Sequence, residues 1–373
     1  MNRLILIGNG FDLSHGLKTS YNDFIFWYMK KALTESYDNV VHNDPLINIS
    51  RDPKYVGSPI TDINDWIDKA YKRGFENVMA TTSMGIWTNA NNVNNDRPFK
   101  VEPKSKFIIA LLSNCSYIKW VDIEAEYYSQ LKTILNGKFP NATKEIELRD
   151  LNVALTELIS QLEIYLTSLT KPEYDDRYMD ILTSPILKKD VHGITIEKEE
   201  EPATTYLLNF NYTDTIKLYA QRFQHNSSQP IPIINYIHGK LGDEENRLIF
   251  GFGDEIDSAY LQMEQETAKG YFDYIKSFWY LRTSNYRELV SMVDAEPFQV
   301  YILGHSCGLS DRTMLHMIFE HPNCKSIKIY YHGDKKKNNY TNITYDIARH
   351  FKDKAEMRNK IVAWDRSENM QQY

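Results

Sequence analysis

The residues best suited to chemistry stand directly after short apolar stretches of the sequence. Asn211 and, three residues later, Asp214 follow the stretch Leu-Leu-Asn-Phe, and His238 and Gly239 follow Ile-Ile-Asn-Tyr-Ile. Histidine has an unperturbed pKa near ~6.5, so it can act as a general base on a sugar hydroxyl. An asparagine amide can hold a water molecule or a hydroxyl group. Both also have structural alternatives, since Asn211 suits a helix N-cap and His238 a core or turn position.

A glycine-rich segment follows the first apolar run, residues 4–7. It contains Gly8, Asn9 and Gly10 and continues into polar residues that include Asp12. A buried strand, a Gly-x-Gly turn and a helix start together form a place for phosphate. Glycine lets the backbone approach, and the helix presents unpaired N–H groups at the positive end of its dipole. A leucine replaces the third glycine of G-x-G-x-x-G, so a plain turn is the alternative.

A second glycine-rich segment, residues 304–308, reads Gly-His-Ser-Cys-Gly and fits the nucleophile elbow G-x-S-x-G. The chain order also allows a triad of Ser306, Asp334 and His350. Against a serine hydrolase, the next helix is expected to start near Ser310 rather than directly after the serine. Only one clear strand follows, and no HGGG-like oxyanion loop occurs upstream.

The amino-acid composition argues against several classes of partner and of site. The chain has 373 residues, 42% hydrophobic and 25% charged, with a formal net charge of −7. Nucleic-acid-binding surfaces depend on Lys and Arg, so we do not expect a nucleic-acid partner. The cysteines, Cys115, Cys307 and Cys324, stand far apart, which predicts neither a metal site nor a disulfide framework and fits a reducing cytoplasm. No apolar run suits a signal peptide or approaches the roughly 18 residues that cross a membrane.

An alternation of apolar runs and helical stretches predicts a mainly parallel sheet. After an acidic linker that ends in proline at position 202, apolar runs occupy residues 204–210, 231–237, 247–252, 297–303 and 326–331. The run at 4–7 needs such a sheet to bury both its faces. We therefore predict a doubly wound, Rossmann-like α/β domain from residues 1–24 and 203–373, with a mostly helical insertion at 25–202. Parallel strands end at one edge, where the polar residues should converge.

Helical periodicity describes most of the insertion. Ser20 can cap a helix together with Asp23. Residues 35–59 and 88–106 are expected to be irregular. Helices are expected near residues 21–33, 61–79, 119–135, 145–169 and 175–187. The longest carries a leucine seam with alternating spacings of three and four, at Leu148, Leu151, Leu155, Leu158 and Leu162. This seam packs either in the core or against a partner helix in a homo-oligomer.

These segments resemble the bacteriophage abortive-infection AbiH family. The resemblance rests on the opening block, residues 4–21, and on the blocks at 210–215, 237–239 and 303–311, while 120–124 also fits. It covers most of the α/β part and is sparse in the insertion. The family is in turn similar to the sirtuin-like NAD-binding domains of phage-defence proteins. The resemblance therefore implies a sirtuin-like fold that takes NAD and needs no metal.

The same resemblance implies roles for individual residues. Gly8 and Gly10 would approach the pyrophosphate, Asn211 would orient water or ribose, and His238 would be the general base. The other implied cofactor-binding residues are Asn9, Asp12, Asp214, Gly239, Gly304, Ser306 and Asp311. Two departures are an aspartate at position 12, where a small or hydroxyl residue is expected, and one extra residue, Thr213, before Asp214. Without zinc-binding cysteines, lysine deacetylation is not expected. Asp311 also suits the first turn of a helix, where the dipole favours an acid.

The expected function is that of an anti-phage protein that binds NAD or a related nucleotide and hydrolyses its N-glycosidic bond. The trigger, whether from phage or host, is not defined by the sequence. Two alternatives stay open: a nucleotide-sensing module without catalysis, and a serine hydrolase that uses Ser306. Cytoplasmic localisation and a small-molecule nucleotide partner follow from the same expectation.

Overall fold

The computed structural model describes residues 1–51, 59–73, 80–81, 98–114, 122–194, 196–223 and 229–370. Its contacts divide the chain into two compact units. Unit 1 comprises Met1–Thr19, Leu169–Glu264 and Tyr274–Tyr373, and unit 2 comprises Ser20–Ser168 and Gln265–Asp273. The division differs from the predicted boundaries at 24 and 203, because residues 169–202 group with unit 1 and Gln265–Asp273 return to unit 2.

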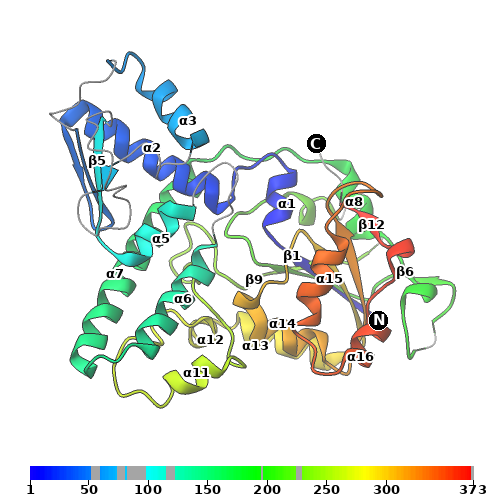
Figure 1. Cartoon of the computed structure of the whole chain (residues 1–373). Helices are drawn as coiled ribbons and strands as arrows, with labels where there is room; N and C mark the ends of the chain where they lie inside the picture. Colours follow the sequence, from blue (N-terminus) through cyan, green and yellow to red (C-terminus); the bar gives the residue numbers. More distant parts are fainter. Residues whose placement is uncertain are drawn as a thin grey trace. The chain divides into compact units, whose positions relative to one another are not determined.

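Unit 1 is built on a six-stranded sheet in which all neighbouring strands are parallel (Figure 1). The order across the sheet is β12-β11-β10-β1-β8-β9. The strands are β1 (Asn2–Ile7), β8 (Thr205–Asn209), β9 (Ile233–Tyr236), β10 (Phe298–Leu303), β11 (Cys324–Tyr331) and β12 (Glu368–Asn369). With only the strands of this sheet numbered along the chain, the order is 3-2-1-4-5-6, which is the doubly wound arrangement, and it reverses between β1 and β10. The predicted α/β fold class is confirmed.

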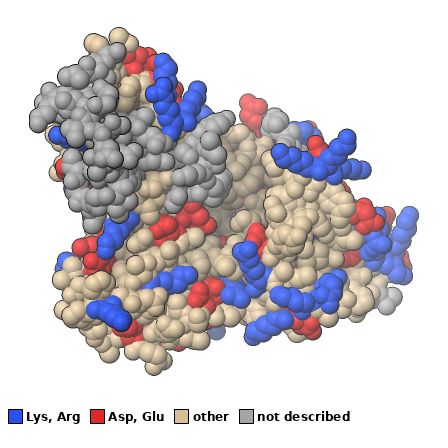
Figure 2. All heavy atoms as spheres, in the orientation of Figure 1, with Lys and Arg blue, Asp and Glu red and all other residues tan. Residues whose placement is uncertain are grey.

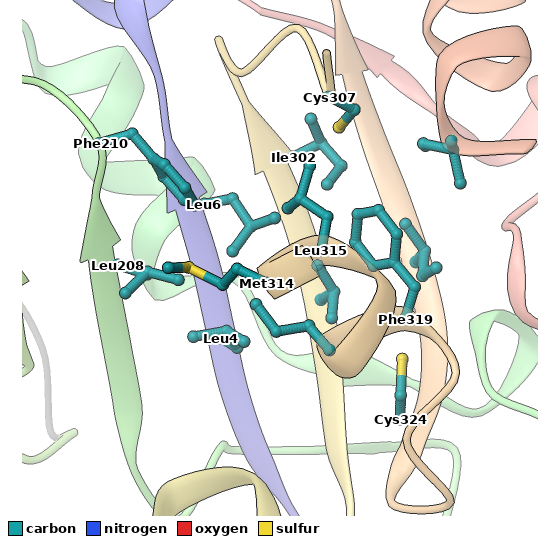
Figure 3. Close-up of a cluster of buried hydrophobic side chains, with 14 of the residues drawn as sticks. Leu4, Leu6, Leu208, Phe210, Ile302, Cys307, Met314, Leu315, Phe319 and Cys324 are labelled. Carbon is teal, nitrogen blue, oxygen red and sulfur yellow. The ribbon is translucent and has the colours of Figure 1, made fainter. Parts of the chain in front are cut away.

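Helices cover both faces of the sheet, which explains the continuous apolar run in β1. Leu4 and Leu6 pack on one face with side chains of α13 (Asn285–Ala295), α14 (Arg312–Phe319) and α15 (Tyr340–Ala348). Figure 3 shows Met314, Leu315 and Phe319 of α14 against the sheet strands β1, β10 and β11. Ile5 and Ile7 pack on the other face with α1 (Asn9–Ser14), α8 (Asp176–Thr183) and α9 (Lys217–Ala220). Each buried aliphatic side chain contributes about 1.5–3 kcal/mol to this core.

The predicted strand at 247–252 is wrong. No strand forms there: Ile249 donates its N–H to the carbonyl oxygen of His238 at 2.8 Å and accepts from the hydroxyl of Tyr212 at 3.2 Å. Its backbone thus pairs with a loop and a side chain instead of a strand ladder. The sixth strand is β12, Glu368–Asn369, whose two polar residues give no apolar pattern from which to predict it.

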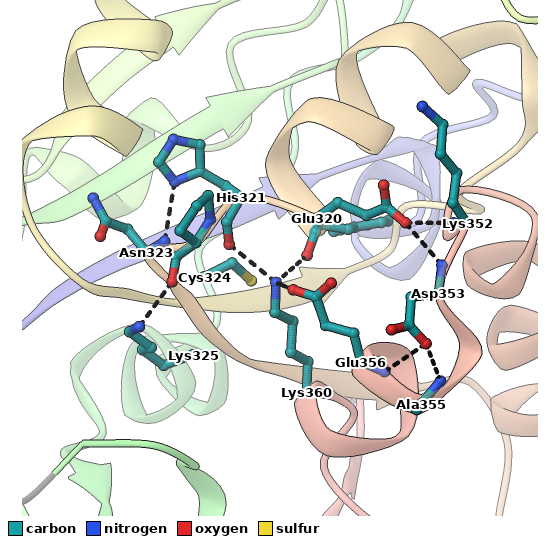
Figure 4. Close-up of polar contacts among 12 residues, drawn as sticks. Glu320, His321, Asn323, Cys324, Lys325, Lys352, Asp353, Ala355, Glu356 and Lys360 are labelled. Atoms are coloured by element: carbon teal, nitrogen blue, oxygen red, sulfur yellow. Dashed lines mark hydrogen bonds and ion pairs between the residues drawn. The ribbon is translucent and has the colours of Figure 1, made fainter.

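The C-terminal end of α14 is held by Lys360, which lies at the end of α16 (Lys354–Lys360) (Figure 4). Its ammonium group donates to the carbonyl oxygens of Phe319 at 2.9 Å and His321 at 3.0 Å, and lies 2.6 Å from Glu356. A cation at a helix C-terminus interacts favourably with the dipole and supplies donors to carbonyls that lack helical partners.

Unit 2 contains α2 (Tyr21–Asn39), α3 (Ile63–Arg73), α5 (Lys106–Asn114), α6 (Ile123–Asn136) and α7 (Asn141–Ser168). The predicted cap is confirmed, because Ser20 Oγ accepts the N–H of Asp23 at 3.1 Å. All residues of the leucine seam on α7 are buried, Leu155 completely. The core interpretation of the seam is therefore confirmed.

Unit 2 also contains a sheet with the order β2-β3-β5-β4 that the sequence analysis does not predict. Its strands are β2 (Val41–Asn43), β3 (Ile47–Arg51), β4 (Ala80–Thr81) and β5 (Phe99–Pro103). In β3 and β5 every second residue is buried, so the expected irregular structure at 35–59 and 88–106 is wrong there. Alternation over five residues is short enough to be lost among polar neighbours. Residues 88–97 of the expected loop lie outside the described residues.

The surface and the helices add two further observations. On the face seen in Figure 2, basic and acidic side chains are interspersed among neutral ones. Among the described residues, no helix combines the length and the apolar character needed to cross a membrane.

Candidate functional site

The carboxyl ends of β1 and β10 are in direct backbone contact. Gly10 donates its N–H to the carbonyl oxygen of Gly304 at 2.8 Å. A Cβ atom on Gly8 would lie 2.4 Å from Cα of His305, and one on Gly304, whose φ is +76°, would lie 2.2 Å from the nitrogen of Phe11. These three glycines therefore have a packing role. The N–H of Gly10 donates to a protein carbonyl, and a role of this turn in phosphate binding stays a prediction.

Asp12 lies beneath this contact and is 1% exposed. Its Oδ2 accepts a hydrogen bond from the hydroxyl of Thr213 at 2.5 Å. Burial raises the pKa of Asp12 to about 6, and side-chain hydrogen bonds from Thr213, Thr215 and Asn211 oppose the rise. Asn9, one turn earlier, accepts from the hydroxyl of Thr19 at 2.5 Å. Thr213, the extra residue before Asp214, thus has a defined partner.

Asn211 joins the end of β8 to the end of β1. Its Nδ2 donates to the carbonyl oxygen of Gly8 at 3.0 Å, and its backbone N–H donates to Oδ1 of Asn209 at 3.2 Å. The residue is 8% exposed. It does not cap a helix, since the N-cap of α9 is Ile216. The structure therefore places this amide at the carboxyl edge of the sheet.

Asp214 and Gly239 occupy the same edge near β9. The hydroxyl of Tyr236 donates to Asp214, and the ammonium group of Lys240 lies 3.2 Å from its carboxylate. Gly239 has a φ of +83°, and a Cβ there would lie 2.2 Å from the carbonyl oxygen of Arg247. Gly239 is thus required by a tight turn, while Asp214 is partly exposed and paired with a cation.

His238 belongs to a buried cluster of ionisable groups centred on Asp311. Its Nε2 lies 3.1 Å from Oδ1 of Asp311, and the ammonium group of Lys276 lies 2.8 Å from the same oxygen. The Nε2 of His305 lies 3.7 Å from Oδ2 of Asp311. The hydroxyl of Tyr280 lies 3.2 Å from Nε2 of His238. Asp311 ends η3 (Leu309–Asp311), Lys276 begins α12 (Lys276–Trp279) and Tyr280 begins η2 (Tyr280–Arg282).

Burial and neighbouring charge set the protonation of this cluster. Burial, and secondarily the charge of Lys276, lowers the pKa of His238 although Asp311 opposes this. Burial lowers the pKa of His305 to about 4. The charge of Lys276, followed by the contact with His238, holds the pKa of the Asp311 carboxyl well below the usual value against the effect of burial. At neutral pH the cluster therefore contains one carboxylate, one ammonium group and two neutral imidazoles.

Sequence reasoning missed three members of this cluster. Lys276 and Tyr280 lie in a stretch without strong periodicity, and only tertiary contacts bring them to the sheet edge. His305 could have been identified from the sequence, because it follows a predicted strand and stands beside a glycine, as His238 does. Asp311 stands in the first turn of η3 and at the N-cap of α14, as its structural alternative expects, and its carboxylate also contacts His238 and Lys276.

The contacts do not assemble the serine hydrolase triad. Ser306 is exposed, and Cys307, not the serine, has a positive φ of 56°. Asp334 accepts backbone N–H groups of its own loop, while Nε2 of His350 hydrogen-bonds the carbonyl oxygen of Cys307 at 2.8 Å. Both partners are thus engaged elsewhere. Within the described ranges, no group of His, Cys, Asp and Glu has an arrangement that could hold a metal ion.

The predicted residues therefore gather at one edge of one sheet. The carboxyl ends of β1, β8 and β10, and the turn after β9, contribute to it through direct contacts. The sequence model of the family described as bacteriophage abortive infection AbiH matches residues 4–332, a range that includes every residue of this edge. A comparison with curated proteins finds no match. A comparison with solved structures finds none either. The predicted resemblance is confirmed: the chain belongs to the bacteriophage abortive infection AbiH family and hence to the proteins of antiviral defence.

Proposed function

We propose that the protein acts in abortive infection by binding NAD or a related nucleotide and hydrolysing the bond between nicotinamide and ribose. The observation that carries the proposal is the buried contact of His238 with Asp311, 3.1 Å long, beside the β1–β10 junction. Sheets with this strand order bind dinucleotides where the order reverses. Asn211 stands at the same edge and supplies an amide for a ribose hydroxyl or a water molecule.

The chemistry requires a group that accepts a proton. Water adds to the ribose carbon as the bond to nicotinamide breaks through an oxocarbenium-like state, and the products are ADP-ribose, nicotinamide and a proton. A neutral imidazole can take that proton from water or from a ribose hydroxyl. His238 meets this condition because its pKa is lowered by burial and by Lys276. Asp311 orients the ring through its contact with Nε2.

The test is nicotinamide release from NAD by the purified full-length protein, followed by chromatography. We expect the His238→Ala and His238→Asn variants to lose 10²- to 10⁴-fold of the rate, the usual contribution of a general base, while circular dichroism shows that they stay folded. His321→Asn is the control, because it replaces a histidine of unit 1 that pairs with Asp294 away from this edge, and it should keep the rate. If the protein needs a trigger, the same comparison is made by measuring the NAD content of phage-infected cells that express each variant.

A second candidate, a nucleotide-binding module without catalysis, is favoured by one observation. The ring of His238 is enclosed by protein partners: Asp311 and Tyr280 lie at Nε2, and a hydrogen bond to the Phe210 backbone occupies the ring further. Such an enclosed ring is typical of a histidine that stabilises the fold and takes no part in catalysis. Calorimetry separates the two candidates, because a sensing module would bind NAD and release no nicotinamide in vitro or in infected cells.

A further inference from the structure

We propose that Lys276 is a positioning residue for the reaction proposed above: its ammonium group serves as the counter-ion of Asp311, so that His238 stays neutral and able to accept a proton. The inference rests on the proposed function for its catalytic meaning. The charge relation among Lys276, Asp311 and His238, all in unit 1, can be measured without NAD.

The geometry gives Lys276 and His238 the same acceptor. Oδ1 of Asp311 lies 2.8 Å from the ammonium nitrogen of Lys276 and 3.1 Å from Nε2 of His238. Lys276 is 0% exposed, and its backbone N–H donates to the carbonyl oxygen of Phe252 at 3.0 Å. A charge removed from water is tolerated only when a partner compensates it. The short contact with Asp311 supplies that compensation and fixes the carboxylate.

The charge balance then decides the state of the histidine. A buried carboxylate beside an imidazole favours the imidazolium, because opposite charges attract strongly where water is excluded. Here Lys276 already neutralises Asp311, so a proton on His238 would add an uncompensated buried positive charge. His238 also hydrogen-bonds the backbone of Phe210, which favours the imidazolium. Its other neighbours include the hydroxyl of Tyr280 and the ring of His305, which is itself held neutral by burial. Neither supplies a negative charge at neutral pH.

The neighbouring ionic pair does not replace Lys276. Arg312 follows Asp311 in the chain, but its guanidinium group lies 3.1 Å from the carboxylate of Asp254, a residue that is 2% exposed. The cation that follows Asp311 in sequence is therefore engaged with another buried acid. Lys276, which is 35 residues away in sequence, is the cation that contacts Asp311 among the described lysines and arginines.

The catalytic consequence is a shift in pH dependence. Replacing Lys276 by methionine keeps the length of the side chain and removes its charge. The carboxylate of Asp311 is then no longer paired with Lys276 and stabilises the protonated form of His238. His238 would then be protonated at neutral pH, and the rise of kcat that follows its deprotonation would move to higher pH. KM should change less than kcat, because Lys276 contacts Asp311 and not the substrate. Arginine keeps the charge and should restore much of the wild-type profile.

The experiment is a histidine titration by NMR on the full chain with labelled imidazoles, in which His238 is assigned by the signal lost in His238→Asn. We expect the pKa of His238 to rise by about one unit or more in Lys276→Met and in Lys276→Gln, and to stay near the wild-type value in Lys276→Arg. The glutamine variant serves where the methionine variant does not fold. Lys360→Met, which removes another buried lysine of unit 1, is the control and should leave His238 unchanged.

An unchanged pKa of His238 in both neutral variants would overturn the inference. The outcome is separate from that of the proposed function. A raised pKa supports the charge relation even if no nicotinamide is released, and in that case only the proposed hydrolysis fails. Nicotinamide release together with an unchanged pKa would support the hydrolysis and overturn the role of Lys276.

Discussion

The side-chain amide of Asn211 donates a hydrogen bond to the carbonyl oxygen of Gly8 at 3.0 Å, although 203 residues separate the two in sequence. The contact joins the end of β8 to the end of β1. A second contact, from the hydroxyl of Thr213 to Asp12 at 2.5 Å, joins the same two segments. The edge that carries the candidate site is thus held by side chains that could also meet a ligand.

Loss of the Asn211 amide should destabilise the protein. Asn211→Ala removes one of two hydrogen bonds to the carbonyl oxygen of Gly8, which still accepts the N–H of Phe11 at 2.9 Å. The net loss of one such hydrogen bond costs about 0.5–1.5 kcal/mol. Urea denaturation measures the change. The control is Asn136→Ala, which removes an exposed amide at the end of α6 and should change stability by less than about 0.5 kcal/mol. Equal effects of the two substitutions would contradict this account of the junction.

The contact between the two glycine segments should tolerate no side chain at Gly8. A Cβ there would lie 2.4 Å from Cα of His305, a backbone atom that cannot move alone. We expect Gly8→Ala to lower the free energy of unfolding by roughly 1–3 kcal/mol, as overpacking usually does. Gly308→Ala is the matched control, because its nearest contact would be 3.6 Å away and its φ is −68°. A stable Gly8→Ala protein would mean that the two loops are farther apart.

The buried carboxyl of Asp12 should give stability a pH dependence of unusual sign. Its pKa is raised from 3.8 to about 6 in the folded protein, so the folded state binds more protons than the unfolded state between these values. This group therefore favours folding at acid pH, and its contribution is lost as pH rises from about 4 to about 6, by up to about 3 kcal/mol.

The Asp12→Asn variant removes this ionisation. The stability of the variant relative to wild type should therefore increase between about pH 4 and about pH 7, as measured by urea denaturation at each pH. Asp65→Asn, which changes an exposed acid on α3, should follow the wild-type curve. Parallel curves for wild type and Asp12→Asn would show that the carboxyl of Asp12 is not perturbed.

Truncation of the leucine seam on α7 should destabilise the fold. Leu155 is completely buried, and Leu155→Ala should cost about 2–5 kcal/mol through lost burial and a residual cavity. Val153 lies on the same helix and is 53% exposed, so Val153→Ala should cost much less. Thermal unfolding compares the two variants. Equal melting temperatures would indicate that the seam packs loosely.

The fold was predictable where local pattern and tertiary environment agree. The run from Leu4 to Ile7 is continuous and apolar because helices cover both faces of β1, and the strand assignment follows directly from that pattern. The run at 247–252 is equally apolar, yet its backbone bonds to a loop, which the pattern does not distinguish from a ladder. β12 has two polar residues and is defined only by its pairing with β11.

The candidate site was predictable only in part, for a related reason. Asn211 and His238 each follow a strand directly, so the sheet itself carries them to its carboxyl edge. Lys276 follows no sheet strand and reaches Asp311 through tertiary packing, so no spacing in the sequence predicts this contact. The glycines were predicted from a motif that does not distinguish two roles. The spacing of Gly8 and Gly10 suggests a phosphate site, but glycine is also required there by the close contact with the loop after β10.

The most direct test of the central claim is a crystal structure of the full-length His238→Ala variant with NAD. The account predicts NAD at the carboxyl edge of the sheet, with its nicotinamide ribose beside Asn211 and the position vacated by His238. NAD bound at another surface, or an empty edge at NAD concentrations that saturate binding in calorimetry, would contradict it.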